Sequence, residues 1–169
     1  MAFWKADRFG DDGFVTVGDG DALPDAGVIV SLSRFRAERD ALLARTAPFG
    51  VALAPTDRPE AIAADLDKIA VVSLAFPKFS DGRSFSTARL LRERHGYTGE
   101  IRATGDVLFD RIGHMIRCGF DAFVIVNQPT IDALTAGKRP GGPLAYQPTG
   151  QDEDEAEAED LKPWRRRAR

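Results

Sequence analysis

Five short apolar runs alternate with helix-like segments between residues 28 and 136, and this alternation restricts the fold more than any other feature of the chain. The apolar runs lie at 28–32, 51–54, 69–76, 100–104 and 122–126. The helix-like segments, with apolar residues three and four positions apart, lie at 33–45, 58–67, 84–95, 106–118 and 129–136. Apolar strands that alternate with amphipathic helices are typical of a parallel sheet covered on both faces.

We therefore predict an α/β protein with a doubly wound, mostly parallel five-stranded sheet, flavodoxin-like or receiver-like. Because crossovers between parallel strands are right-handed, few strand orders are possible, and we expect the order 2-1-3-4-5. A fragment of a β/α barrel is the alternative.

The chain divides into three parts by composition. Residues 1–27 are expected to form a β-rich extension, with a short hairpin between the Phe3–Lys5 region and residues 14–17. Residues 28–136 form the α/β domain. The highly charged segment 137–169 is expected to be a disordered tail, acidic from Asp152 to Asp160 and basic after that, with Trp164 as the one residue suited to anchor an interface.

Composition and motifs exclude several classes of protein. No apolar run approaches the roughly 20 residues that span a bilayer, and no secretory signal begins the chain, so we expect a cytoplasmic protein without membrane contact. A net charge of −3 argues against a general nucleic-acid binder. The single cysteine, Cys118, cannot build a disulfide framework or an iron–sulfur cluster. Neither a dinucleotide fingerprint nor a phosphate-binding loop occurs, and the strand ends lack the Asp and Lys of a phosphoacceptor receiver, so no cofactor is expected.

The candidate site lies at the carboxyl ends of the strands, where open α/β sheets bind their ligands. Basic and acidic residues gather after the third and fourth strands, within a segment, 78–117, of net charge +3. A helix N-terminus there would favour an anion or an acidic partner. The residues are Lys78, Asp81, Arg83, Arg89, Arg102 and Asp106. Salt bridges within the loop, above all between Asp81 and Arg83, are an equally plausible reading of the same residues.

The positions of the two histidines and the cysteine favour structural roles over catalysis or metal binding. His95 falls at a helix C-terminus, where a cation is favourable. His114 and Cys118 are four residues apart and so share a helix face, but a zinc site needs three or four ligands. We therefore expect no metal site, and a cysteine that packs in the core.

One set of motifs resembles the bacterial family called domain of unknown function 934. The runs that carry the resemblance are Phe76-Pro77-Lys78-Phe79-Ser80-Asp81-Gly82-Arg83-Ser84-Phe85-Ser86, Ala88-Arg89-Leu90-Leu91-Arg92, Gly99-Glu100-Ile101-Arg102-Ala103-Thr104-Gly105-Asp106-Val107-Leu108 and Arg117-Cys118-Gly119-Phe120-Asp121-Ala122-Phe123. Members of this family are commonly described as probable oxidoreductases of sulfite reduction and are encoded beside the sulfite/nitrite reductase haemoprotein. The resemblance implies a role in assimilatory sulfite and sulfate reduction, and hence in cysteine supply.

Two hypotheses of different classes follow. In the first, the protein is an accessory that docks on the reductase haemoprotein, or on a neighbouring enzyme of sulfur assimilation, through its basic strand-end surface. In the second, it is a small enzyme that binds an oxyanion or a nucleotide phosphate at the same edge of the sheet. The first is preferred, because the motif contains no evident acid–base or nucleophile–base pair.

Overall fold

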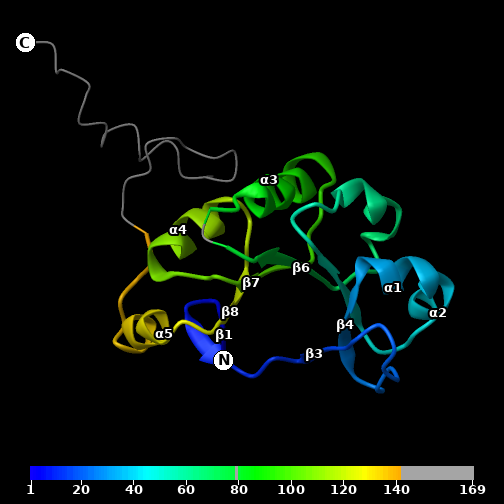
Figure 1. Cartoon of the computed structure of the whole chain (residues 1–169), viewed down its shortest axis with the longest axis horizontal. Helices are drawn as coiled ribbons and strands as arrows, with labels where there is room; N and C mark the ends of the chain where they lie inside the picture. Colours follow the sequence, from blue (N-terminus) through cyan, green and yellow to red (C-terminus); the bar gives the residue numbers. More distant parts are fainter. Residues whose placement is uncertain (79, 142–169) are drawn as a thin grey trace, which may run out of the picture.

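The computed structural model describes residues 1–78 and 80–141, which form one eight-stranded sheet with helices packed on it (Figure 1). The strands, in chain order, are β1 (Ala2–Lys5), β2 (Arg8–Gly10), β3 (Phe14–Thr16), β4 (Gly27–Ser31), β5 (Phe49–Leu53), β6 (Val71–Phe76), β7 (Glu100–Gly105) and β8 (Ala122–Ile125). The helices are α1 (Leu32–Ala37), α2 (Arg39–Leu43), the 3₁₀ turns η1 (Pro59–Ala61) and η2 (Ala63–Asp65), α3 (Arg83–Arg89), the π-helical turn η3 (Leu90–Arg94), α4 (Phe109–Arg117) and α5 (Gln128–Thr135).

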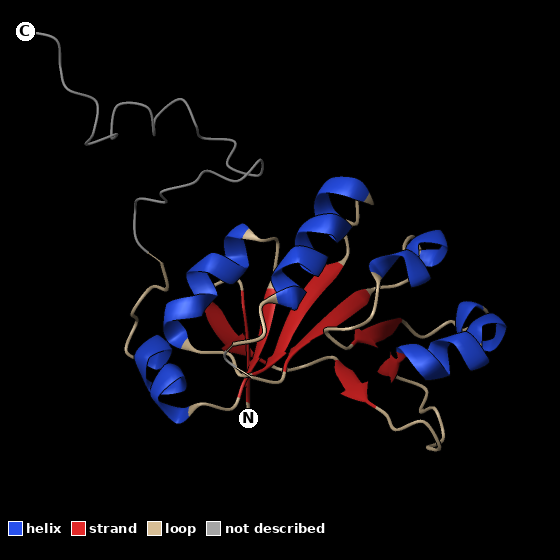
Figure 2. Ribbon diagram, turned by 45° about the horizontal axis from the view of Figure 1, so that its top comes forward, coloured by secondary structure: helices blue, strands red, loops and turns tan. Residues whose placement is uncertain are grey.

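The five predicted strands are present as β4 to β8, but their order in the sheet is sequential, so the predicted order 2-1-3-4-5 is wrong. Across the sheet the strands run β2-β1-β8-β7-β6-β5-β4-β3. When every right-handed crossover moves in the same direction, the connecting helices fall on the same face. The sheet is therefore wound once, with its helices on the outer side (Figure 2), and it is not doubly wound. Sequential order is that of a β/α barrel, the alternative considered above.

The N-terminal hairpin is present, although with a different second strand from the predicted one. β1 pairs with β2 through the two-residue turn Ala6-Asp7, whose φ angles of 50° and 60° match a type I′ turn. β1 also pairs antiparallel with β8, whereas β3 pairs in parallel with β4. The predicted partner segment, residues 14–17, thus belongs to the opposite edge of the sheet.

The connection between β2 and β3 forces the sheet to curl. These two strands are the opposite edges of the sheet, yet only residues 11–13 separate them. The four peptide units from Gly10 to Phe14 reach at most about 14 Å, whereas the edges of a flat eight-stranded sheet would lie about 34 Å apart. Residues 8–16 therefore act as one bent strand, which bonds β1 with its first half and β4 with its second half and draws the two edges together.

The two faces of the sheet differ in composition. The outer face packs large apolar side chains, such as Val30, Leu74 and Phe123, against the helices in one continuous core. On the inner face, adjacent strands align residues that are mostly small or polar: Ser31, Ala52, Ser73, Arg102 and Ala122. Among residues 1–78 and 80–141, no second layer of helices covers this row. The N-terminal segment lies against it instead, as the contacts of Arg102 show below.

The last described residues pack on the outside of α4. A side chain at Gly113 would place its Cβ 2.6 Å from the Cα of Gly141, so only glycine permits this close approach of the two backbones. Ordered packing thus continues beyond residue 136, where the α/β domain was predicted to end. The acidic and basic parts of the predicted tail, and Trp164, lie outside the described residues. No helix within the described ranges has the length and apolar character needed to cross a membrane.

Candidate functional site

The loop between β6 and α3 holds an ion pair at the carboxyl edge of the sheet. The guanidinium of Arg83 donates to both carboxylate oxygens of Asp81, with N–O distances of 2.9 and 2.7 Å. The backbone N–H of Arg83 also donates to Asp81 Oδ1, at 3.3 Å. The hydrogen bonds from Arg83 lower the pKa of Asp81, and the carboxylate raises the pKa of Arg83. The loop salt bridge considered from the sequence is therefore present.

The Asp81–Arg83 pair reduces the number of hydrogen-bond donors that the start of α3 has available for a ligand. The amide of Arg83, in the first turn of the helix, was expected to bind an external anion, but it already donates to the chain's own carboxylate. Lys78, two residues after the end of β6, is exposed, and within residues 1–78 and 80–141 its side-chain ammonium has no hydrogen-bond or ion-pair partner. Of the predicted anion-binding groups in this loop, Lys78 is the one that the described contacts leave available.

Arg89 lies farther along the same helix and is also paired. Its guanidinium donates to Glu93, one helical turn later, at 3.0 and 3.1 Å, and about half of each side chain is exposed (49% and 47%). Leu90, beside Arg89, is one of the large apolar side chains that remain exposed, at 37%. The outer surface of α3 and η3 therefore presents paired charges beside one exposed apolar side chain.

Asp106 lies next to this loop because β7 pairs with β6 and ends at the same edge. Its backbone N–H donates to the carbonyl oxygen of Phe76 at 2.8 Å, while Gly105 before it turns the chain at φ 90°. The prediction that Asp106 begins a helix is wrong, because α4 starts at Phe109 and its N-cap is Leu108. The Asp106 carboxylate, half-buried, has no bonding partner in the described part of the chain.

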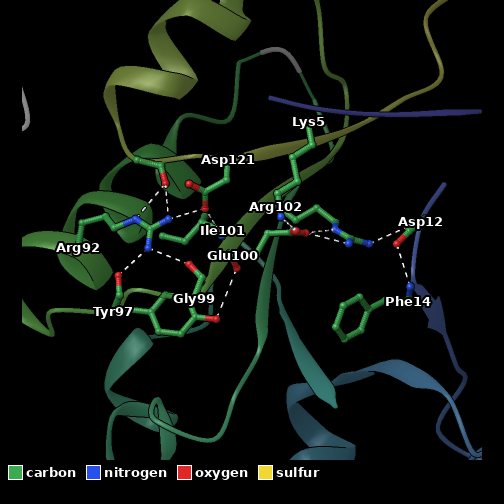
Figure 3. A network of polar contacts seen from close by, with 11 residues as sticks. Lys5, Asp12, Phe14, Arg92, Tyr97, Gly99, Glu100, Ile101, Arg102 and Asp121 are labelled. Carbon is green, nitrogen blue, oxygen red and sulfur yellow. Dashed lines mark hydrogen bonds and ion pairs between the residues drawn. The ribbon is translucent and has the colours of Figure 1, made fainter. Parts of the chain in front are cut away.

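Arg102 does not belong to this surface. It lies in the middle of β7, is 2% exposed and points toward the inner face of the curled sheet (Figure 3). Its guanidinium donates to Glu100 at 2.8 and 2.9 Å and to Asp12 at 2.8 Å. The rings of Phe3 and Phe14 lie 4.7 and 5.6 Å from its guanidinium carbon. Arg102 is therefore a structural cation that joins β7 to both ends of the N-terminal segment.

Arg92, which contributes to the positive charge of the 78–117 segment, is also structural. Its guanidinium donates to the carbonyl oxygens of Tyr97, Gly99 and Gly119 and to the carboxylate of Asp121, all at 2.5–3.1 Å (Figure 3). The same carboxylate accepts from the backbone N–H of Ile101 at 2.8 Å. Arg92 thus connects η3 to the beginnings of β7 and β8. Arg92 belongs to one of the sequence runs that carry the family resemblance, and these structural contacts account for its presence there.

The predicted proximity of His114 and Cys118 is confirmed, with 3.7 Å between Nε2 and Sγ. Burial raises the pKa of the Cys118 thiol, and burial together with Arg117, Arg111 and Arg89 lowers the pKa of His114. Both shifts favour the neutral forms, so this pair does not hold a thiolate. Among the described residues, no three His, Cys, Asp or Glu side chains group together as metal ligands do.

Two arginines of α4, Arg111 and Arg117, were not among the predicted site residues. The guanidinium carbon of Arg111 lies 5.2 Å from the ring centroid of Phe76 and 5.1 Å from that of Phe85, which places it between α4, β6 and α3. Arg117, at the other end of the helix, has no carboxylate partner in the described ranges. Six residues turn an α-helix through about 600°, so the spacing alone does not place both arginines on one face, and the sequence held no signal that grouped them with Arg89.

Comparison with known proteins gives a family. No curated protein matches the sequence. Residues 50–156, more than half of the chain, match the family described as "Bacterial protein of unknown function (DUF934)". The matched range contains β6 to β8 and all but the first residue of β5, the loop after β6, the contacts of Arg92, and Arg102 with Glu100. The chain is therefore a member of the bacterial DUF934 family.

Proposed function

We propose that this protein is an accessory of assimilatory sulfite reduction, which docks on the sulfite reductase haemoprotein or on a neighbouring enzyme of sulfur assimilation. The docking surface consists of the loop after β6 and the exposed side of α3 and η3. Its biological setting rests on the family resemblance, and its location rests on the geometry of this surface.

Docking is preferred to catalysis because of one observation: the charged side chains at this edge are exposed, and two of the arginines are oriented by ion pairs. Arg83 is fixed by Asp81 and Arg89 by Glu93, while Lys78 extends from the same loop without a partner in the described residues. Charges that are already oriented lose less conformational entropy when they meet a partner. An exposed surface of alternating charge also favours specificity and rapid association.

The enzyme hypothesis has one observation in its favour, which is the unpaired Lys78 beside the unpaired carboxylate of Asp106. A cation and a general base at neighbouring strand ends suit an oxyanion substrate. The amide at the start of α3 gives such a substrate less support, because Asp81 accepts its hydrogen bond. Calorimetric titration of the protein with sulfite, sulfate and a nucleotide distinguishes the hypotheses: saturable binding that Lys78→Ala abolishes supports the enzyme, and no heat of binding removes it.

Docking is tested with the purified reductase haemoprotein and the full-length protein, by biolayer interferometry at two salt concentrations. We expect Lys78→Glu and Arg89→Glu each to weaken binding by about fivefold or more, since reversing a charge replaces an attraction by a repulsion. Binding should also weaken between about 0.1 and 1 M salt, as the Debye length falls from about 10 to about 3 Å.

The matched control is Arg36→Glu, on α1, an exposed arginine that has no described partner and lies away from α3 (Figure 1). It should leave the affinity unchanged. If all three variants bind equally well, or if the wild-type protein does not bind the reductase or its neighbours at any salt concentration, the proposed function is wrong.

A further inference from the structure

The surface proposed for docking extends across the seam between α3 and α4 and carries excess positive charge. We use "the α3–α4 face" for this surface, which contains Lys78, Arg83, Arg89, Arg111 and Arg117 together with Asp81, Glu93, Asp106 and Asp110. Five cations and four carboxylates give the face a net charge of +1. His114 lies among them, because Arg117, Arg111 and Arg89 are the charges that act on its ring. The surplus is local, since the whole chain carries −3.

The described chain ends against the outer side of α4, next to this face. Pro140 and Gly141 pack against Gly113, which lies one helical turn before Arg117 on nearly the same side of α4. The close approach of the two backbones fixes where the following residues start. Arg117 is thus about 6 Å farther along the helix from the point where the described chain leaves it.

The residues that follow carry the complementary charge. Residues 152–160, the acidic block, contain seven carboxylates and no base. Asp152 lies eleven residues beyond Gly141, and this length can reach about 38 Å, which exceeds the roughly 12 Å length of α4. The family match also extends to residue 156, so the beginning of the acidic block belongs to the part of the chain that the family model covers.

We propose that the acidic block binds the α3–α4 face of its own chain in the free protein. A segment tethered so close to its binding surface has an effective concentration in the millimolar range, so that weak ion pairs are sufficient for occupancy. The inference deepens the proposed function and rests on it for its biological meaning: a partner that docks on this face must displace the acidic block, and therefore presents acidic groups of its own.

Zero-length carbodiimide cross-linking of the full-length protein tests this inference directly, because the reagent joins a carboxylate to an amine only when the two are in contact. Lys78 is the lysine on the α3–α4 face, and Lys68, exposed before β6 at the other edge of the sheet, is the internal reference. We expect links from residues 152–160 to Lys78 to exceed those to Lys68 by about fivefold at about 0.1 M salt. They should disappear at about 1 M salt.

Two variants give the test its specificity. Arg117→Ala should lower the yield of the Lys78 links by about twofold to fivefold, the range expected for the loss of one surface ion pair. Arg36→Ala, the matched control on α1, should leave it unchanged. Equal yields at Lys78 and Lys68, no effect of Arg117→Ala, or links found only between differently isotope-labelled chains would each overturn the inference. The assay contains no reductase, so its failure is distinct from a failure of the proposed docking.

Discussion

Replacement of Arg102 by methionine should destabilise the protein strongly, because this buried cation is the central contact of the inner face. The guanidinium bonds Glu100 and Asp12 and lies against the rings of Phe3 and Phe14. Methionine is apolar and fills a similar space, so the substitution removes the charge with little loss of packing. It leaves the Glu100 carboxylate, 11% exposed, with Lys5 as its remaining cation, at 2.7 Å.

The expected magnitude follows from this burial. Removing one partner of a buried ion pair costs about 3–5 kcal/mol, because the other charge remains desolvated. Since Asp12 and Lys5 are partly exposed and can be hydrated, we expect the lower end, about 3 kcal/mol. A domain of this size has a total stability of about 5–15 kcal/mol, and such a loss lowers Tm by about 6–12 °C.

Urea denaturation of four proteins measures the effect: wild type, Arg102→Met, Glu100→Gln and the double variant. The double variant should be no less stable than Arg102→Met alone, since it no longer buries an unpaired carboxylate. Arg36→Met on the surface of α1 is the control and should change the free energy of unfolding by less than about 0.5 kcal/mol. A loss below about 1 kcal/mol for Arg102→Met, or purely additive effects in the double variant, would refute the reasoning.

Three further substitutions test other parts of the structure. Arg92→Lys keeps the charge but cannot reach four acceptors on two loops, so the free energy of unfolding in urea should fall by about 2 kcal/mol. An unchanged urea midpoint would contradict the role of the guanidinium. Gly113→Ala places a Cβ 2.6 Å from Gly141 and should release the segment before it, so that trypsin cleaves after Lys138 several-fold faster while global stability changes little. Equal cleavage rates would show that this packing is absent. His114 has a lowered pKa in the folded protein, so the unfolded chain binds the proton more readily and stability should be lost as the pH falls below about 6.5. In a series of Tm measurements between about pH 7.5 and 5.5, His114→Asn should show a smaller loss of Tm than the wild type. Parallel Tm profiles of the two proteins would contradict this role of His114.

The elements of the domain could be predicted from the sequence because each has a strong local signal. The apolar runs predicted as strands correspond to β4 to β8, and the last three segments with helical spacing correspond to α3 to α5. Where local signals were weaker, the helices broke: the segment predicted at 33–45 divides at Glu38 into α1 and α2, and the segment at 58–67 forms two 3₁₀ turns. Amphipathic spacing over so few helical turns does not fix the type or the continuity of a helix.

The strand order was predicted wrongly because the strands were treated as apolar on both faces. Residues that alternate with the large apolar ones are mostly small or polar, including Ser31, Gly50, Ala52, Ser73 and Thr104. Such positions do not pack well against a layer of helices, but they suit the crowded interior of a curled sheet. Arg102 in the same row was the clearest sign, since a buried cation needs carboxylates that a helical layer would have had to provide.

Most charged residues of the family motif are explained by folding, and this narrows where function can lie. Arg92 and Asp121 join η3 to two strands, Glu100 and Arg102 close the inner face, and Asp81 binds the first turn of α3 through Arg83. A sequence motif cannot separate such residues from functional ones, because both need charge at fixed positions. What remains after these assignments is a small exposed set at the start of α3 and along the α3–α4 seam. Because these side chains contribute little to stability, their replacement should affect binding while leaving the fold intact, so the docking experiments report on function alone.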